Sequence, residues 1–120
     1  MAQRVALARA LAREPELLFA DEPFSALDAI TRAGMQSLLV ELVHRWHTAV
    51  LLVTHDIDEA ILVADRILLM GRDEGHDAPG RIVQEWTLNI ARPRDAHSSE
   101  VVELRMQILA ALRTLQITTD

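Results

Sequence analysis

The stretch Leu17-Leu18-Phe19-Ala20-Asp21-Glu22-Pro23 decides the fold, because an apolar run leads directly into two carboxylates and a proline. Such an uninterrupted run is typical of a strand buried on both faces. Charges do not fit in the middle of such a strand, since an unpaired buried carboxylate is very costly. We therefore predict that Asp21 and Glu22 lie where the strand leaves the sheet, the edge at which open α/β sheets bind ligands. Two carboxylates there suit a divalent cation and a general base.

A second apolar run, Ala49-Val50-Leu51-Leu52-Val53, also ends in polar residues, Thr54-His55-Asp56. Each run is followed by a helical pattern, and two strand–helix units in succession indicate parallel strands with right-handed crossovers. The carboxyl ends of parallel strands meet at one edge of the sheet. We therefore expect Asp21, Glu22 and His55 to lie near one another.

Capping residues mark where the two helices begin. Asp28 is predicted to be the N-cap of a helix from about Ala29 to Trp46, whose apolar residues recur with a period of 3.6. Asp56 is predicted to cap a second helix that runs to about Ala64. Glu59 stands three residues after Asp56, so it would complete a variant of the capping box.

The C-terminal part predicts a hairpin and a helix. Strands over Arg66–Met70 and Arg81–Leu88 flank the polar, glycine-containing segment Gly71–Gly80, which is typical of a long exposed loop. Arg92-Pro93-Arg94 is interpreted as a linker. Ser98 or Ser99 would cap a last helix, whose apolar stripe consists of Val101, Leu104, Ile108, Leu112 and Leu115.

Composition excludes several classes of function. Half of the residues are hydrophobic, so a chain disordered throughout is not expected. A formal net charge of −6 argues against a nucleic-acid binder driven by phosphate contacts. Without cysteine there is no disulfide and no thiolate–metal site. No stretch approaches the roughly 18 apolar residues that span a bilayer, so a role at a membrane would be at its surface.

Four short motifs become recognisable together. Leu17–Pro23 looks like a Walker B strand with its catalytic glutamate, Ser25-Ala26-Leu27-Asp28 matches a D-loop, and Thr54-His55-Asp56 matches the H-loop with its switch histidine. A helix predicted over Ala2 to about Arg13 contains Gln3–Leu11, which looks like the segment after the L-S-G-G-Q signature. In this order and spacing the motifs resemble the C-terminal portion of the ATP-binding subunit of ABC transporters.

The resemblance implies a fold and a domain division. The expected fold is α/β: a partial P-loop NTPase (ABC ATPase) sheet with parallel strands, a C-terminal hairpin and a terminal helix. Residues 1–90 would form the C-terminal part of the ABC ATPase domain, and residues 91–120 a linker and an amphipathic helix. The segment from Ala91 to Leu112 is similar to the nitrate/sulfonate/taurine importer subfamily.

The resemblance also implies roles for single residues. Asp21 would hold the Mg²⁺ of MgATP through water, because Mg²⁺ prefers oxygen ligands and keeps much of its hydration. Glu22 would orient or deprotonate the attacking water. His55 would contact the γ-phosphate and stabilise developing charge. Asp28 would reach across a dimer interface, and Gln3 would flank the signature helix whose N-terminus faces the partner's nucleotide.

The sequence departs severely from the family. It contains no G-x-x-x-x-G-K-[ST] loop and no lysine, so the backbone cradle and the cation for the phosphates are missing. We therefore expect a C-terminal fragment of an ABC ATPase, from a truncated gene or a misplaced start codon. The alternative is a non-catalytic remnant that folds partly or not at all and hydrolyses nothing, and this reading of the fragment is compatible with an active parent.

The intact parent would work with partners. A second ATP-binding subunit would form a head-to-tail dimer with it on a transmembrane permease, in the cytoplasm at the inner face of the cell membrane. A soluble ABC ATPase of DNA repair or translation is the alternative, against which the net charge of −6 weighs. Asp21 and Glu22 as a plain surface pair and His55 as a plain loop residue are the simpler alternatives. His44 and His47, which could share a metal, are interpreted as a solvated helix face.

Overall fold

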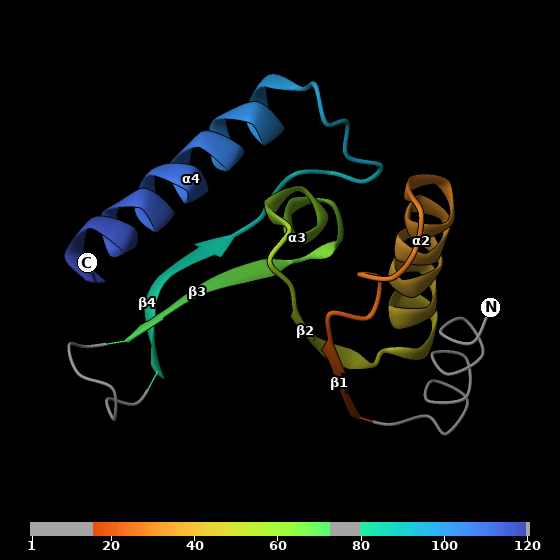
Figure 1. The fold of residues 1–120 in the computed structure, drawn as a ribbon. Coiled ribbons are helices and arrows are strands. Elements are labelled where there is room, and N and C mark those ends of the chain that lie inside the picture. Colours follow the sequence, from red (N-terminus) through yellow and green to blue (C-terminus); the bar gives the residue numbers. More distant parts are fainter. Residues whose placement is uncertain (1–15, 73–79, 120) are drawn as a thin grey trace. The chain divides into compact units, whose positions relative to one another are not determined.

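The computed structural model describes residues 16–72 and 80–119, and the chain divides into two units between Glu59 and Ala60 (Figure 1). The helix expected over Ala2–Arg13, and Gln3 within it, lie outside the described residues. The elements in chain order are β1 (Leu17–Asp21), α2 (Ala29–Trp46), β2 (Ala49–Val53), α3 (Ile57–Val63), β3 (Arg66–Arg72), β4 (Gly80–Thr87) and α4 (Ser99–Thr119). The predicted α/β fold with a hairpin and a terminal helix is confirmed.

Strands β1 and β2 of the first unit pair in parallel, as predicted. The register runs from Leu17 opposite Ala49 to Asp21 opposite Val53. Both strands are rich in apolar residues, and α2 connects them along the chain, which is the arrangement that parallel pairing requires. Both polar strand ends therefore lie at the same edge.

One face of this two-stranded sheet is packed and the other is exposed. Val50 and Leu52 pack against a core cluster of Phe24, Met35 and Leu39. On the other face, Leu17 and Phe19 are 64% and 60% exposed. The prediction that these strands are buried on both faces is therefore wrong for the part of the chain described. Side chains alternate between the faces of a strand, and α2 covers only one of them.

Helix α2 begins and ends as its sequence predicts. Asp28 is its N-cap, and its Oδ1 accepts a hydrogen bond of 2.9 Å from the backbone N–H of Thr31. Met35 and Leu39 are buried on its inner face. The helix ends at His47, whose left-handed φ of 54° breaks the helical path.

The second unit consists of an antiparallel hairpin and helix α4. Strand β3 pairs with β4 from Arg66 opposite Thr87, with an irregularity between Leu69 and Met70. A Cβ atom at Gly71 would come within 2.6 Å of Val83 Cγ2 and 3.2 Å of Leu115 Cδ2, so this position accepts only glycine without a shift. Buried side chains of the unit are Ile61, Ile67, Trp86, Leu88, Val101 and Ile108.

Helix α4 begins after Ser98, whose Oγ accepts a hydrogen bond of 3.3 Å from the N–H of Val101, as its sequence predicts. Within the described ranges, neither this helix nor any other combines the length and the apolar character that crossing a bilayer requires.

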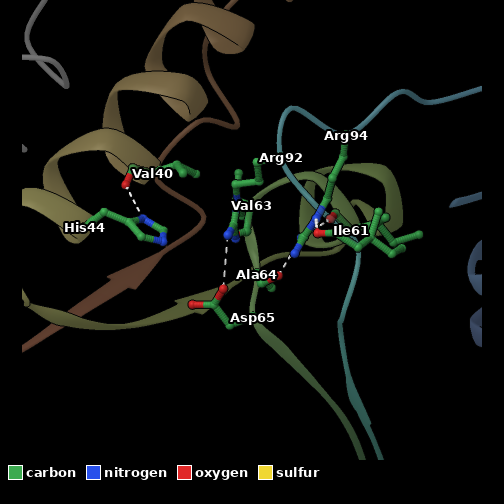
Figure 2. Close-up of polar contacts among 9 residues, drawn as sticks. Val40, His44, Ile61, Val63, Ala64, Asp65, Arg92 and Arg94 are labelled. Atoms are coloured by element: carbon green, nitrogen blue, oxygen red, sulfur yellow. Dashed lines mark hydrogen bonds and ion pairs between the residues drawn. The ribbon is translucent and has the colours of Figure 1, made fainter. Parts of the chain in front are cut away.

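Two arginines of the predicted linker cap the C-terminal end of α3 (Figure 2). Arg94 Nη1 donates to the carbonyls of Ile61 at 2.7 Å and Ala64 at 2.6 Å, and Arg92 Nη2 donates to the carbonyl of Val63 at 2.7 Å. The last carbonyls of a helix lack partners within it, so these contacts satisfy groups that the helix leaves free. The linker therefore has a structural role in this unit.

Arg92 and Arg94 also make contacts outside α3. Arg94 Nε donates to the carbonyl of Ile90 at 3.0 Å, and Arg92 Nη1 pairs with Asp65 Oδ1 at 3.1 Å. Partial burial lowers the pKa of Arg94, and the charge of Arg92 lowers it further. The two guanidinium groups therefore tie the segment before α4 to the end of α3.

We expect Arg94→Ala to lower the free energy of unfolding by about 2 kcal/mol, because it leaves partly buried carbonyls without donors. Urea denaturation of the chain measures this change. Arg113→Ala, which removes an exposed arginine of α4, is the matched control and should change stability by less than about 0.5 kcal/mol. Equal effects of the two substitutions would show that the contacts to α3 contribute nothing.

Candidate functional site

The polar ends of β1 and β2 meet at one edge of the parallel sheet. Asp21 is the last residue of β1, and Thr54 directly follows β2. The N–H of Glu22 donates to the carbonyl of Val53 at 2.8 Å, which extends the pairing by one bond past Asp21. Glu22 and His55 are therefore placed by the register of the sheet, because each follows a strand end within one or two residues.

Glu22 and His55 contact each other as the strand ends predict. The backbone N–H of His55 donates to Glu22 Oε1 at 3.0 Å, and His55 Nε2 lies 3.5 Å from the same oxygen. The Glu22 side chain is 32% exposed and that of His55 is 94% exposed. Asp21 is exposed at the end of the strand. A half-buried carboxylate is thus oriented by a backbone donor, while the imidazole is open to a ligand.

The backbone at Glu22 is in the left-handed region, with φ at 49°. Residues other than glycine seldom adopt this conformation, because Cβ crowds the following carbonyl oxygen. The turn after Glu22 is held by its own carbonyl, which accepts from Ser25 N at 3.3 Å and Ser25 Oγ at 3.1 Å. The reversal of the chain at Glu22 lets its carboxylate reach the end of β2.

A pocket of about 290 Å³ lies at this edge, and its lining consists of Glu22, Ser25, Arg32, Thr54, His55, Asp56 and Glu59. Sequence reasoning missed Arg32, whose guanidinium donates to the carbonyls of Phe24 at 3.2 Å and Leu27 at 2.8 Å. These bonds hold the turn between β1 and α2. Every residue has a backbone carbonyl, so the sequence does not show which carbonyls an arginine will bind. This contact could therefore not be predicted from the sequence.

Asp28 acts as a helix cap and does not line the pocket. Hydrogen bonds from the backbone and the side chain of Thr31 lower the pKa of Asp28 below its usual value. The carboxylate is exposed, and both of its oxygens accept from Thr31, at 2.9 Å and 3.1 Å. Its predicted role at a dimer interface stays a prediction.

The predicted capping box at the start of α3 is half formed. Asp56 Oδ1 accepts from the N–H of Glu59 at 3.2 Å, as predicted. The N–H of Asp56, however, donates to Thr54 Oγ1 at 3.0 Å. The reciprocal bond from Glu59 is therefore not made, and the Glu59 carboxylate instead accepts from Gln36 Nε2 at 2.9 Å. The Thr54 hydroxyl thus accepts the Asp56 N–H that Glu59 would bind in a complete capping box.

The side chains at this edge supply only some of the ligands that a metal ion needs. Asp21 and Glu22 supply the oxygen ligands that Mg²⁺ prefers, but no three His, Cys, Asp or Glu side chains of residues 16–72 and 80–119 converge on a metal-sized site. His44 Nδ1 lies 2.8 Å from the carbonyl of Val40 (Figure 2), and both His44 and His47 are exposed. The interpretation of this pair as a solvated helix face agrees with that geometry.

Comparison with known proteins finds close relatives, although no protein-family model matches the chain. Aliphatic sulfonates import ATP-binding protein SsuB 2 of Burkholderia lata is 48% identical over 120 residues, which is 100% of this chain and 42% of the relative. The protein of the same name from Nocardia farcinica is 52% identical over 110 residues, 92% of this chain and 43% of the relative.

Granulibacter bethesdensis SsuB is 51% identical over 111 residues, 92% of this chain and 44% of the relative. The chain matches part of an ABC ATP-binding subunit. It spans about 40–45% of the length of the relatives it matches. The α/β fold with a parallel strand pair, a hairpin and a terminal helix is that of part of an ABC ATPase.

The cap of α2 should make the stability of this chain depend on pH. The pKa of Asp28 is lowered in the folded state from the ordinary value of 3.8, so the ionised cap stabilises α2 above that pH. This stabilisation should be lost as the pH falls through the folded pKa.

Amide exchange of α2 between about pH 5 and pH 2 measures this loss. Asp28→Asn cannot ionise, so the acid-induced loss at α2 should be smaller in that variant than in the unchanged chain. Glu41→Gln, which changes another exposed acid of α2, should keep the full loss. An undiminished loss in Asp28→Asn would contradict the role of the cap.

Proposed function

We propose that this chain is part of the ATP-binding subunit of an ABC importer. In that subunit, the residues at the ends of its two parallel strands would take part in the hydrolysis of ATP. The observation that carries the proposal is the bond from His55 N–H to Glu22 Oε1 at the ends of two in-register parallel strands. The relatives are named as ATP-binding proteins for the import of aliphatic sulfonates. Their names support ATP binding and an aliphatic sulfonate as the imported solute of the intact parent.

Glu22 is proposed to be the general base. Its carboxylate is half-buried, Oε1 accepts from the His55 N–H, and the residue lines the pocket. A carboxylate fixed in this way orients a water molecule and accepts its proton as the water attacks a phosphate. The exposed His55 imidazole, whose Nε2 lies 3.5 Å from Glu22 Oε1, would donate to a phosphate oxygen as charge develops there. Asp21 would contribute carboxylate oxygens to a hydrated Mg²⁺.

ATP with Mg²⁺ would supply the phosphoryl group and the metal charge that polarises it. The 120 residues lack the lysine and the glycine-rich loop that hold the phosphates in this family. The described residues also bring together too few ligands to fix a metal. The remaining contacts to the nucleotide are therefore assigned to parts of the parent that this sequence does not contain.

The proposed parent works as an assembly. A second ATP-binding subunit would face it head to tail, with Asp28 and Gln3 near that interface. A transmembrane permease would anchor the pair at the cytoplasmic face of the membrane. Asp28 is exposed at the N-terminus of α2, where its carboxylate accepts from Thr31, and it would contact the second subunit from there.

A second candidate function is that of a non-catalytic remnant. The observation in its favour is the missing phosphate loop, because the printed chain has no lysine and no G-x-x-x-x-G-K-[ST]. In this case the 120 residues fold around the same strand pair but hydrolyse nothing by themselves.

The first test uses a chimaera in which these 120 residues replace the matching segment of the Burkholderia lata relative. Glu22→Gln keeps the shape of the side chain but removes its basicity, so we expect hydrolysis to fall at least about 100-fold. Binding of MgATP should be retained. Glu41→Gln, which changes an exposed acid on α2, should leave the rate of ATP hydrolysis unchanged. Hydrolysis undiminished in Glu22→Gln would exclude Glu22 as the base.

The second test uses the 120-residue chain alone. Isothermal titration should show no saturable binding at sub-millimolar MgATP, because the phosphate cradle is missing from this sequence. Clear binding in that range would show that these residues hold a nucleotide by themselves.

A further inference from the structure

A buried carboxylate joins α2 to α3 beside the candidate site. Glu59 of α3 is 5% exposed, and Gln36 of α2 is 8% exposed. Gln36 Nε2 donates to Glu59 Oε1 at 2.9 Å. Glutamate is almost never this buried unless it is paired, because burial of a charge is costly. Nothing in the proposed chemistry uses Glu59 directly, so its burial calls for a different reason.

The two helices joined by this bond begin at the two loops of the site. Helix α2 starts at Asp28, after the turn that Glu22 opens, and α3 starts at Ile57, after His55 and Asp56. A bond between these helices therefore constrains the distance between the loops. Each loop carries one partner of the contact between Glu22 and His55.

Glu59 contacts the loop after β2 through its backbone and helix α2 through its side chain. Its backbone N–H donates to Asp56 Oδ1 at 3.2 Å, while its carboxylate accepts from Gln36. Asp56 is the neighbour of His55, whose N–H donates to Glu22 Oε1 at 3.0 Å. Contacts thus run without interruption from Gln36 through Glu59 and Asp56 to the pair of Glu22 and His55.

We propose that Gln36 and Glu59 form a positioning pair that holds the His55 N–H against the Glu22 carboxylate. The importance of this pair for catalysis rests on the proposed function. Its effect on the contact between the His55 N–H and Glu22 does not. The Gln36 amide satisfies the Glu59 carboxylate without bringing a further charge into this buried contact. Loss of the pair should loosen the loop after β2 before it affects the strands.

The test measures amide hydrogen exchange by NMR in the 120-residue chain without nucleotide. Gln36→Glu places two carboxylates where one donor and one acceptor stood, so the helices should separate at this point. We expect exchange at the His55 amide to increase at least about tenfold, which corresponds to 1.4 kcal/mol. Ser37→Glu adds the same charge at the exposed neighbouring position of α2 and should leave the His55 amide unchanged.

The decisive variant exchanges the two side chains. Gln36→Glu combined with Glu59→Gln restores one donor and one acceptor with reversed direction, so protection of the His55 amide should return. Amides of β1 and β2 report whether the first unit has unfolded, and they should keep their protection in every variant.

Two results would overturn the proposal. One is unchanged exchange at His55 in Gln36→Glu. The other is a failure of the exchanged pair to restore protection, whether the single variant is folded or unfolded, because a general packing defect would not be cured by reversing the bond. Since no nucleotide is present, these outcomes are independent of whether the intact parent hydrolyses ATP.

Discussion

Parallel pairing between β1 and β2 brings together Glu22 and His55, the central pair of the candidate site. With Asp21 opposite Val53, the strand ends are level, and the Glu22 carboxylate meets the N–H of His55. A slip of one residue would shift Glu22 by about 3.3 Å and turn each β1 side chain to the other face of the sheet. The contact between Glu22 and His55 would then be lost. The geometry of the site thus depends on the register of the two strands.

Much of this arrangement could be predicted, because local chemistry decided it. The strand ends, the cap at Asp28 and the proximity of Glu22 to His55 each follow from residue type and chain order. Burial of β1 was predicted wrongly, because an apolar run indicates what a strand can bury and not what covers it. Phe19 shows the difference, since it suits a buried face but lies on the exposed one.

The contacts that escaped prediction share a physical feature. Arg32, Arg92 and Arg94 donate to backbone carbonyls, which every residue offers, so no pattern in the sequence marks the acceptor. Glu59 was expected to bond its own helix, but the hydroxyl of Thr54 lies closer to the free N–H. Which of several nearby acceptors a given N–H binds is decided only when the chain has folded. Polar contacts of this kind therefore need a structure.

The left-handed backbone at Glu22 has a consequence for protein engineering. Glycine or asparagine accepts such a φ of 49° more readily than glutamate, by roughly 1 kcal/mol for glycine. Selection of variants for thermal resistance alone would thus favour replacing the very residue that meets His55. A library screened only for yield or heat tolerance would drift toward a better-folded chain without its carboxylate. Keeping Glu22 in such a library requires selection for activity as well as for folding.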